Sequence, residues 1–113
     1  MAAGVVHIPW YATLFRSDAF AEALNEFAPT ALRYGATDYR VYRSRDDAYK
    51  FLHMCTFEEK EAWEAYWYGP EFNHFRAQYS SYYQVPVLYV WHDMTIQGAL
   101  DAAPAEAGAA NGS

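Results

Sequence analysis

The sequence predicts an α+β domain of the ferredoxin-like type, a four-stranded antiparallel sheet with two helices on one face. Stretches rich in β-branched and aromatic residues alternate with segments of helical spacing, in the order strand, helix, strand, strand, helix, strand. In addition, the third and last strands carry large apolar side chains on both faces. Because helices cover only one face of such a sheet, we expect two chains to pack sheet to sheet.

The first strand and first helix occupy the N-terminal third of the chain. Residues 5–15 are rich in β-branched and aromatic side chains and predict a strand, which Pro9 places at an edge or a bulge. From Asp18 apolar residues recur at i, i+3, i+4 and i+7, the spacing of one helix face. Pro29 should kink this helix, and Gly35 should end it near residue 34.

A hairpin follows. Residues 37–44 alternate in the manner of a strand, residues 44–47 supply a polar turn, and residues 48–57 predict the antiparallel partner. One face of this partner strand should hold Tyr49, Phe51, His53, Cys55 and Phe57. The other face should hold Leu52 and Met54, so that neither face is polar throughout.

The second helical region is the most aromatic part of the chain. Thr56 and Glu59 have the spacing of a capping box, and Gly69-Pro70 predicts a break. The aromatic residues with helical spacing on either side of the break are Trp63, Tyr66, Trp67, Phe72, Phe75 and Tyr79. Residues 85–94 predict the last strand. Its alternation should place Val85, Val87, Tyr89 and Trp91 on one face.

Residues 1–97 are expected to form one domain. The segment 98–113 consists mostly of Ala, Gly and acidic or small residues, and predicts a disordered tail. A domain of fewer than 100 residues buries only about 60 to 65% of its unfolded surface, so that association is an accessible source of stability. A homodimer is therefore expected on this ground as well.

Composition narrows the classes of partner. The net charge of −6 and the pI of about 5.0 argue against nucleic acid, because phosphate contacts need cationic side chains. The longest apolar runs are far shorter than the roughly 20 residues of a membrane span, which argues against a membrane partner. A single cysteine and an N-terminal stretch without the pattern of a signal peptide predict a cytoplasmic protein.

The stretches "FEEKEAWEAYWYGPEF" and "YYQVPVLYVW" carry a resemblance to a known group. With the length and the order of elements, they resemble the dimeric α/β-barrel superfamily, in particular the antibiotic-biosynthesis-monooxygenase-like domains of bacteria, over roughly residues 5–95. The resemblance implies a homodimer with a small-molecule pocket in each subunit between the helices and the sheet. Members with such motifs do different jobs, so that it implies no single reaction.

Trp63, Tyr66 and Trp67 are the first candidates for a ligand-binding wall. Aromatic residues at helical spacing usually pack a core or an interface, but hydroxyl and indole N–H groups also suit a flat aromatic ligand. Cofactor-free monooxygenases of the superfamily position a phenolic substrate whose own anion activates oxygen. By this analogy Arg76 joins the ligand-binding candidates, and His53, mid-strand on an aromatic face, is the candidate catalytic residue.

His74 supports an alternative, because it follows the Gly-Pro break. The resemblance extends to haem-degrading proteins, which carry a Trp before the break and a His after it. Aligned on Gly69-Pro70, these positions fall on Tyr66 and Phe75, one residue from Trp67 and His74. The histidines show no metal-ligand spacing, so that no metal site is predicted.

The preferred hypothesis is a homodimer that binds a small aromatic or polyketide-like molecule, without a cofactor, as an oxygenase or a cyclase. Haem binding or haem degradation is the second hypothesis, and under this hypothesis haem is the cofactor. The third is a non-enzymatic dimer that acts as an interaction module, its aromatic residues used in packing. Cys55 is expected to be a small buried core residue.

Overall fold

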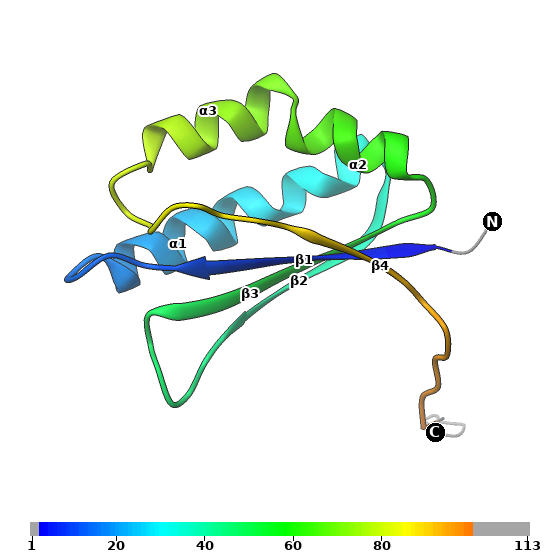
Figure 1. The fold of residues 1–113 in the computed structure, drawn as a ribbon, viewed down its shortest axis with the longest axis horizontal. Helices are drawn as coiled ribbons and strands as arrows, with labels where there is room; N and C mark the ends of the chain where they lie inside the picture. The colour runs from blue at the N-terminus through cyan, green and yellow to red at the C-terminus, as the bar shows by residue number, and fades with distance from the viewer. Residues whose placement is uncertain (1–2, 101–113) are drawn as a thin grey trace.

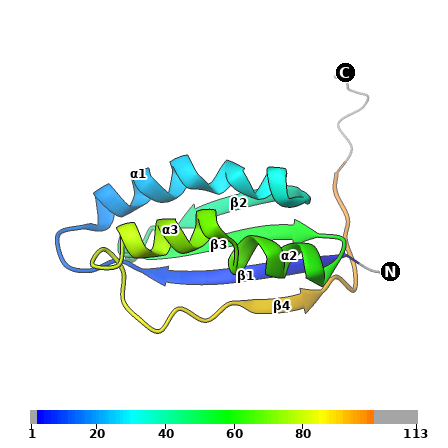
Figure 2. The same ribbon diagram turned by 90° about the horizontal axis from the view of Figure 1, so that it is seen from above.

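Residues 3–100 are described in this computed structural model, where four strands and three helices with a 3₁₀ segment form two layers (Figures 1 and 2). The elements are β1 (Gly4–Tyr11), α1 (Ser17–Phe27), the 3₁₀ helix η1 (Ala28–Tyr34), β2 (Ala36–Arg43), β3 (Lys50–Phe57), α2 (Lys60–Trp67), α3 (Pro70–Gln78) and β4 (Val90–Asp93). The strand order is β2-β3-β1-β4 with antiparallel neighbours. The ferredoxin-like prediction is confirmed. Most of the predicted tail, residues 101–113, lies outside the described residues.

β1 lies at the centre of the sheet but is paired on both sides over only half its length. It pairs with β3 from Gly4 to Tyr11, and with β4 only from Gly4 to His7. Pro9 therefore lies where β1 has a free edge, in agreement with the prediction. The predicted extension of this strand to residue 15 is wrong, because the chain turns after Ala12 and Phe15 adopts a φ of 69° with its ring 89% exposed.

The first helix bends where the sequence predicts. α1 gives way to the narrower η1 at Ala28, directly before Pro29, which cannot donate a backbone hydrogen bond. Gly35 then ends the helical region with a φ of 103°, a conformation that glycine adopts without steric cost.

The break between α2 and α3 is also confirmed, but the predicted capping box is wrong. Glu59 is the N-cap of α2 and makes no side-chain capping bond, whereas the Thr56 hydroxyl donates to the Asp38 carboxylate on β2 at 2.8 Å. Pairing across the sheet thus takes the hydroxyl that would have capped the helix. At the break, a Cβ on Gly69 would clash with the carbonyl oxygen of Ala65, so that the close turn requires glycine.

The last strand is shorter than predicted. Regular pairing begins at Val90, and the side chain of Val85 is 75% exposed rather than turned inward. Val87, Tyr89 and Trp91 do pack against the core, as the alternation predicts. The physical reason for the shortening lies in β1: continuing the register from His7↔Val90 would place Leu88 opposite Pro9, which has no N–H to donate.

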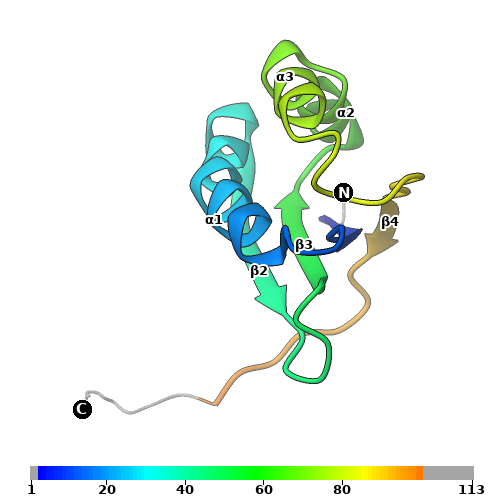
Figure 3. The same cartoon turned by 90° about the vertical axis from the view of Figure 1, so that its left-hand side faces the viewer.

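The two faces of the sheet differ in what covers them. The face toward the helices carries Val6, Ile8, Trp10, Phe51, His53, Cys55 and Phe57, all buried. The opposite face carries Val5, Pro9, Tyr42, Leu52, Met54 and Val90 together with the polar residues His7, Asp38, Arg40 and His92, all exposed or half-buried. Figure 3 shows the helical layer on one side of the sheet only. The sheet therefore has an open second face that carries both apolar and polar side chains.

Candidate functional site

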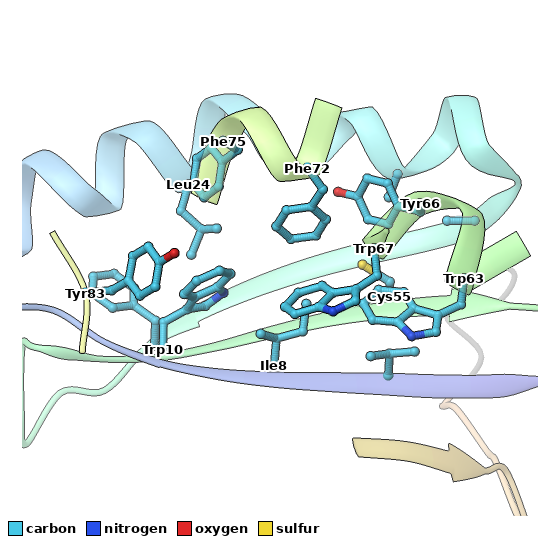
Figure 4. Packing of buried hydrophobic residues seen from close by; sticks show 14 of the residues in the cluster. Ile8, Trp10, Leu24, Cys55, Trp63, Tyr66, Trp67, Phe72, Phe75 and Tyr83 are labelled. Atoms are coloured by element: carbon cyan, nitrogen blue, oxygen red, sulfur yellow. The ribbon is translucent and has the colours of Figure 1, made fainter. Parts of the chain in front are cut away.

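An aromatic wall stands between the helices and the sheet. We use this name for Trp63, Tyr66 and Trp67 of α2 and Phe72 of α3. The rings of Trp63, Trp67 and Phe72 point from the helices toward the sheet, whereas the Tyr66 ring lies between the helices (Figure 4). The ring centroids of Trp63 and Trp67 are 5.4 Å apart, and Phe72 lies 4.8 Å from both Tyr66 and Trp67. The spacing i, i+3, i+4 places these rings on one helix face, as the sequence predicts.

Tyr89 closes one side of the wall. Its ring lies edge-on to Trp63 at 4.9 Å and to Trp67 at 5.4 Å. Tyr89 comes from the irregular segment before β4, so that this side of the wall is bounded by chain without regular pairing. The sequence predicts that Tyr89 faces inward, but its contact with Trp63 and Trp67 depends on how the segment before β4 crosses the helices.

Arg76 packs against the same wall. Its guanidinium carbon lies 4.0 Å from the centroid of the Trp67 ring and 4.8 Å from that of Phe72. Nη2 donates to the Trp67 carbonyl at 2.7 Å and to Asn73 Oδ1 at 2.5 Å, which fixes the plane of the group. Burial lowers the pKa of Arg76, but a guanidinium remains a cation at neutral pH.

Three polar atoms of this region are buried with no hydrogen-bond partner among the described residues. They are Trp63 Nε1, the Tyr66 hydroxyl and Arg76 Nη1. Leaving such a group unsatisfied costs about 1–3 kcal/mol, so that three in one cluster is unusual for a core that serves packing alone. Burial also raises the pKa of Tyr66, whose hydroxyl is therefore protonated and able to donate.

His53 lies on β3 beneath the wall, fully buried. Trp10 Nε1 donates to its Nδ1 at 3.3 Å, and because an indole nitrogen can only donate, Nδ1 must be the unprotonated nitrogen. The remaining N–H is then on Nε2, 3.7 Å from Cys55 Sγ. Burial lowers the pKa of His53 to about 4 and raises that of Cys55 to about 12. Both groups are neutral, and Cys55 is buried as expected.

His74 is separated from the wall. Its side chain is exposed and lines a groove of about 480 Å³ between α1, η1 and α3, together with Glu26 of α1 and Glu71 of α3. The buried neighbour Phe75 occupies the helix face that the alignment with haem-degrading proteins assigns to histidine. Haem binding at His74 stays a prediction.

Residues 3–100 lack the features of two other classes of site. No group of three or more His, Cys, Asp or Glu side chains in residues 3–100 gathers where it could hold a metal ion. Within the same residues, every helix is too short or too polar to cross a membrane. The cytoplasmic location stays a prediction.

Comparison with known proteins gives the fold. No family model matches the sequence, and no curated protein matches it closely enough to be a relative. Solved structures do match. A protein of Nitrosomonas europaea, provisionally described as an antibiotic biosynthesis monooxygenase, superposes with a TM-score of 0.75 and 16% identity, over 83% of this chain and 91% of that one.

Two further solved structures superpose on this chain equally well. A protein from Bordetella bronchiseptica with the same provisional description has a TM-score of 0.74 and 11% identity, and covers 85% of this chain and all of its own. A variant of SnoaB, a cofactor-independent oxygenase from Streptomyces nogalater, has a TM-score of 0.74 and 10% identity, over 86% of this chain and 97% of that one. This chain shares the ferredoxin-like fold of these three structures. At such low identity the likeness shows the fold alone and not a shared reaction.

The structure sorts the predicted site residues into two groups. Trp63, Tyr66, Trp67 and Arg76 lie together, with His53 under them, whereas His74 lies in the separate groove. Two residues apart on α3, Arg76 and His74 differ in direction by about 200°. The groove across α1 was missed because its two walls are far apart in sequence.

Proposed function

We propose that this chain binds a planar aromatic molecule in its anionic form against the aromatic wall, and oxidises it without a cofactor. The substrate class is a polycyclic phenol of the polyketide type, and the reaction is a monooxygenation. The likeness to SnoaB, named as a cofactor-independent oxygenase, supports the reaction type.

The observation that carries the proposal is the free guanidinium nitrogen of Arg76. Nη2 of this side chain is held by Trp67 and Asn73, while Nη1 is buried and has no partner among residues 3–100. A half-buried cation with one free donor beside an indole face offers a charge-assisted hydrogen bond to a phenolate oxygen. The same substrate would stack on Trp67, and the hydroxyl of Tyr66 is a second donor.

The proposed reaction requires the protein to bind the substrate and to stabilise its anion. In a phenol whose ring CH₂ lies beside a conjugated carbonyl, loss of a proton gives an anion that can reduce dioxygen. The balanced reaction converts the CH₂ and O₂ into C=O and H₂O, so that the substrate itself supplies all the electrons. Stabilising this anion is the contribution we assign to Arg76. His53, neutral and linked to Trp10, has an orienting role in this proposal, and its predicted catalytic role stays a prediction.

Access to the aromatic wall must come from the side of Tyr89. The segment from Gln84 to Tyr89 has no regular pairing, and Val85 and Leu88 on it are exposed. A displacement of this segment would open the space beside Trp67 and leave the sheet and helices in place. We therefore place substrate entry between this segment and the helices α2 and α3.

Arg76→Gln tests the proposal with 1,8-dihydroxyanthrone as the substrate, followed by quinone absorbance and oxygen consumption. Loss of a charged hydrogen bond is expected to lower the rate of oxidation about 10- to 100-fold. Arg76→Lys, which keeps the charge, should retain more activity than Arg76→Gln. Arg45→Gln, on the exposed hairpin, is the control and should match the wild type. A wild-type rate equal to that without protein would exclude the oxygenase.

We also propose that the protein is a homodimer joined through the open face of the sheet. Leu52 lies on this face beside Pro9 and Tyr42 at the edge of an apolar hollow of about 310 Å³. Sheet-to-sheet packing would cover these side chains and supply the stability that a small domain lacks.

Leu52→Glu should convert the dimer to a monomer, because it would bury a carboxylate without a partner in the interface. Analytical ultracentrifugation gives the readout, with Ala77→Glu on the exposed side of α3 as the control of equal charge. A wild type that sediments as a monomer would contradict the homodimer. A dimer that binds no phenol would favour the alternative of a non-enzymatic interaction module.

A further inference from the structure

The groove at His74 has the dimensions and lining of a second ligand site. Its volume of about 480 Å³ lies within the usual range for small-molecule sites, roughly 300–1,000 Å³. It lies between α1, η1 and α3, and neither Arg76 nor any residue of α2 lines it. The groove is therefore distinct from the aromatic wall used in the proposed function.

Three aromatic rings line the groove in a row. The rings of Phe27 and Phe75 are stacked with centroids 4.5 Å apart, and Tyr79 follows at 5.1 Å from Phe75. Phe27 and Tyr79 are half-buried, so that part of each ring remains accessible. Phe75 is buried, so that the accessible aromatic surface of the groove belongs to Phe27 and Tyr79, which can contact an apolar body and attract a cation.

The charge of the groove is negative. Neither lysine nor arginine is among its lining residues, and the ion pairs within the described part of the chain join Arg33 to Glu71, Arg40 to Asp38 and Arg43 to Asp18. Glu71 is thus neutralised by Arg33 at 2.7 Å, and Glu26 is left as a carboxylate outside these pairs. Thr30 and Gln78 add hydrogen-bonding groups to the rim.

We propose that this groove binds a small molecule with an aromatic or aliphatic body and a protonated amine. The amine pairs with Glu26, and the body lies on the accessible parts of Phe27 and Tyr79. Charge complementarity decides the class of ligand: an anion would meet an unneutralised carboxylate, and a neutral molecule would gain only the apolar contact. The inference does not depend on the oxygenase activity, because the two sites share no lining residue.

The experiment compares three probes of similar shape by NMR titration of the full chain. The probes are 2-phenylethylammonium, neutral 2-phenylethanol and anionic 3-phenylpropionate. The expected result is saturable shifts at His74 and Tyr79, with the ammonium bound about fivefold more tightly than the alcohol and the carboxylate weakest. Glu26→Gln should remove the preference for the cation. Glu22→Gln, exposed on the same helix but outside the groove, should preserve it.

Three results would overturn the proposal. One is equal affinity for the three probes, or binding of none. Another is a set of shifts at Trp63 and Trp67 without shifts at His74, which would place the amine at the aromatic wall. The third is a concentration-dependent shift at His74 without any probe, which would assign the groove to a second copy of the chain. Variants of Arg76 should leave the titration unchanged. Failure of the oxygenase proposal can therefore be distinguished from failure of the amine site.

Discussion

Phe72→Ala is expected to lower the free energy of unfolding by about 4 kcal/mol, within the usual range for removing a buried phenylalanine. The ring of Phe72 is fully buried at the junction of both helices and the sheet, where it meets Trp10, Tyr66 and Trp67. Removing it leaves a cavity that these large rings cannot fill without leaving their rotamers. A domain of this size is stable by only about 5–15 kcal/mol, so that the loss is a large fraction of the total.

Urea unfolding at fixed protein concentration measures the effect, because association would otherwise change the apparent stability. The matched control is Phe15→Ala, since the Phe15 ring is 89% exposed and its removal should change stability by less than about 0.5 kcal/mol. A cost below about 1 kcal/mol at Phe72 would mean that the core closes easily around the gap. In that case the wall would be more adaptable than its packing indicates.

Acidification from pH 7 to pH 5 is expected to destabilise the fold by about 2 kcal/mol through His53 alone, taking its ordinary pKa for the unfolded chain. That pKa is 6.5, and burial lowers it to about 4 in the folded protein. Between these two values the unfolded chain binds a proton that the folded protein does not. The contribution of the neutral imidazole is therefore complete above pH 6.5 and is lost as the pH falls toward 4.

His53→Gln should flatten this dependence, because glutamine keeps an acceptor for Trp10 Nε1 and does not titrate. Unfolding curves at pH 7 and pH 5 give the comparison. Glu71 and Asp47 do not contribute to this comparison, because their carboxyl groups titrate below pH 5. Their pKa values are lowered from 4.5 and 3.8 by Arg33 and Tyr11 respectively. His7→Gln is the control for a second histidine with a lowered pKa, caused by burial and by His92. Equal slopes for wild type and His53→Gln would contradict the assignment.

Local patterns in the sequence suffice for most of the fold. The period of apolar residues distinguishes the helices from the strands, Pro29 marks the change from α1 to η1, and Gly69 marks the break between α2 and α3. The predicted ends of helices and strands were wrong where a contact between residues distant in sequence determines them. Thr56 could cap α2 by spacing, but Asp38 on a neighbouring strand takes its hydroxyl. The last strand begins at Val90 because of Pro9, some eighty residues earlier.

The candidate site divides in the same way. By itself, the sequence determined the order of elements, the inward face of α2 and α3, and hence the grouping of Trp63, Tyr66 and Trp67, because these follow from helical geometry over a few residues. Only the tertiary structure decided that Arg76 lies on the Trp67 ring with one nitrogen free, that His53 accepts from Trp10, and that His74 faces a groove walled by α1. These features require elements to meet across the fold, and such meetings depend on packing rather than on spacing along the chain.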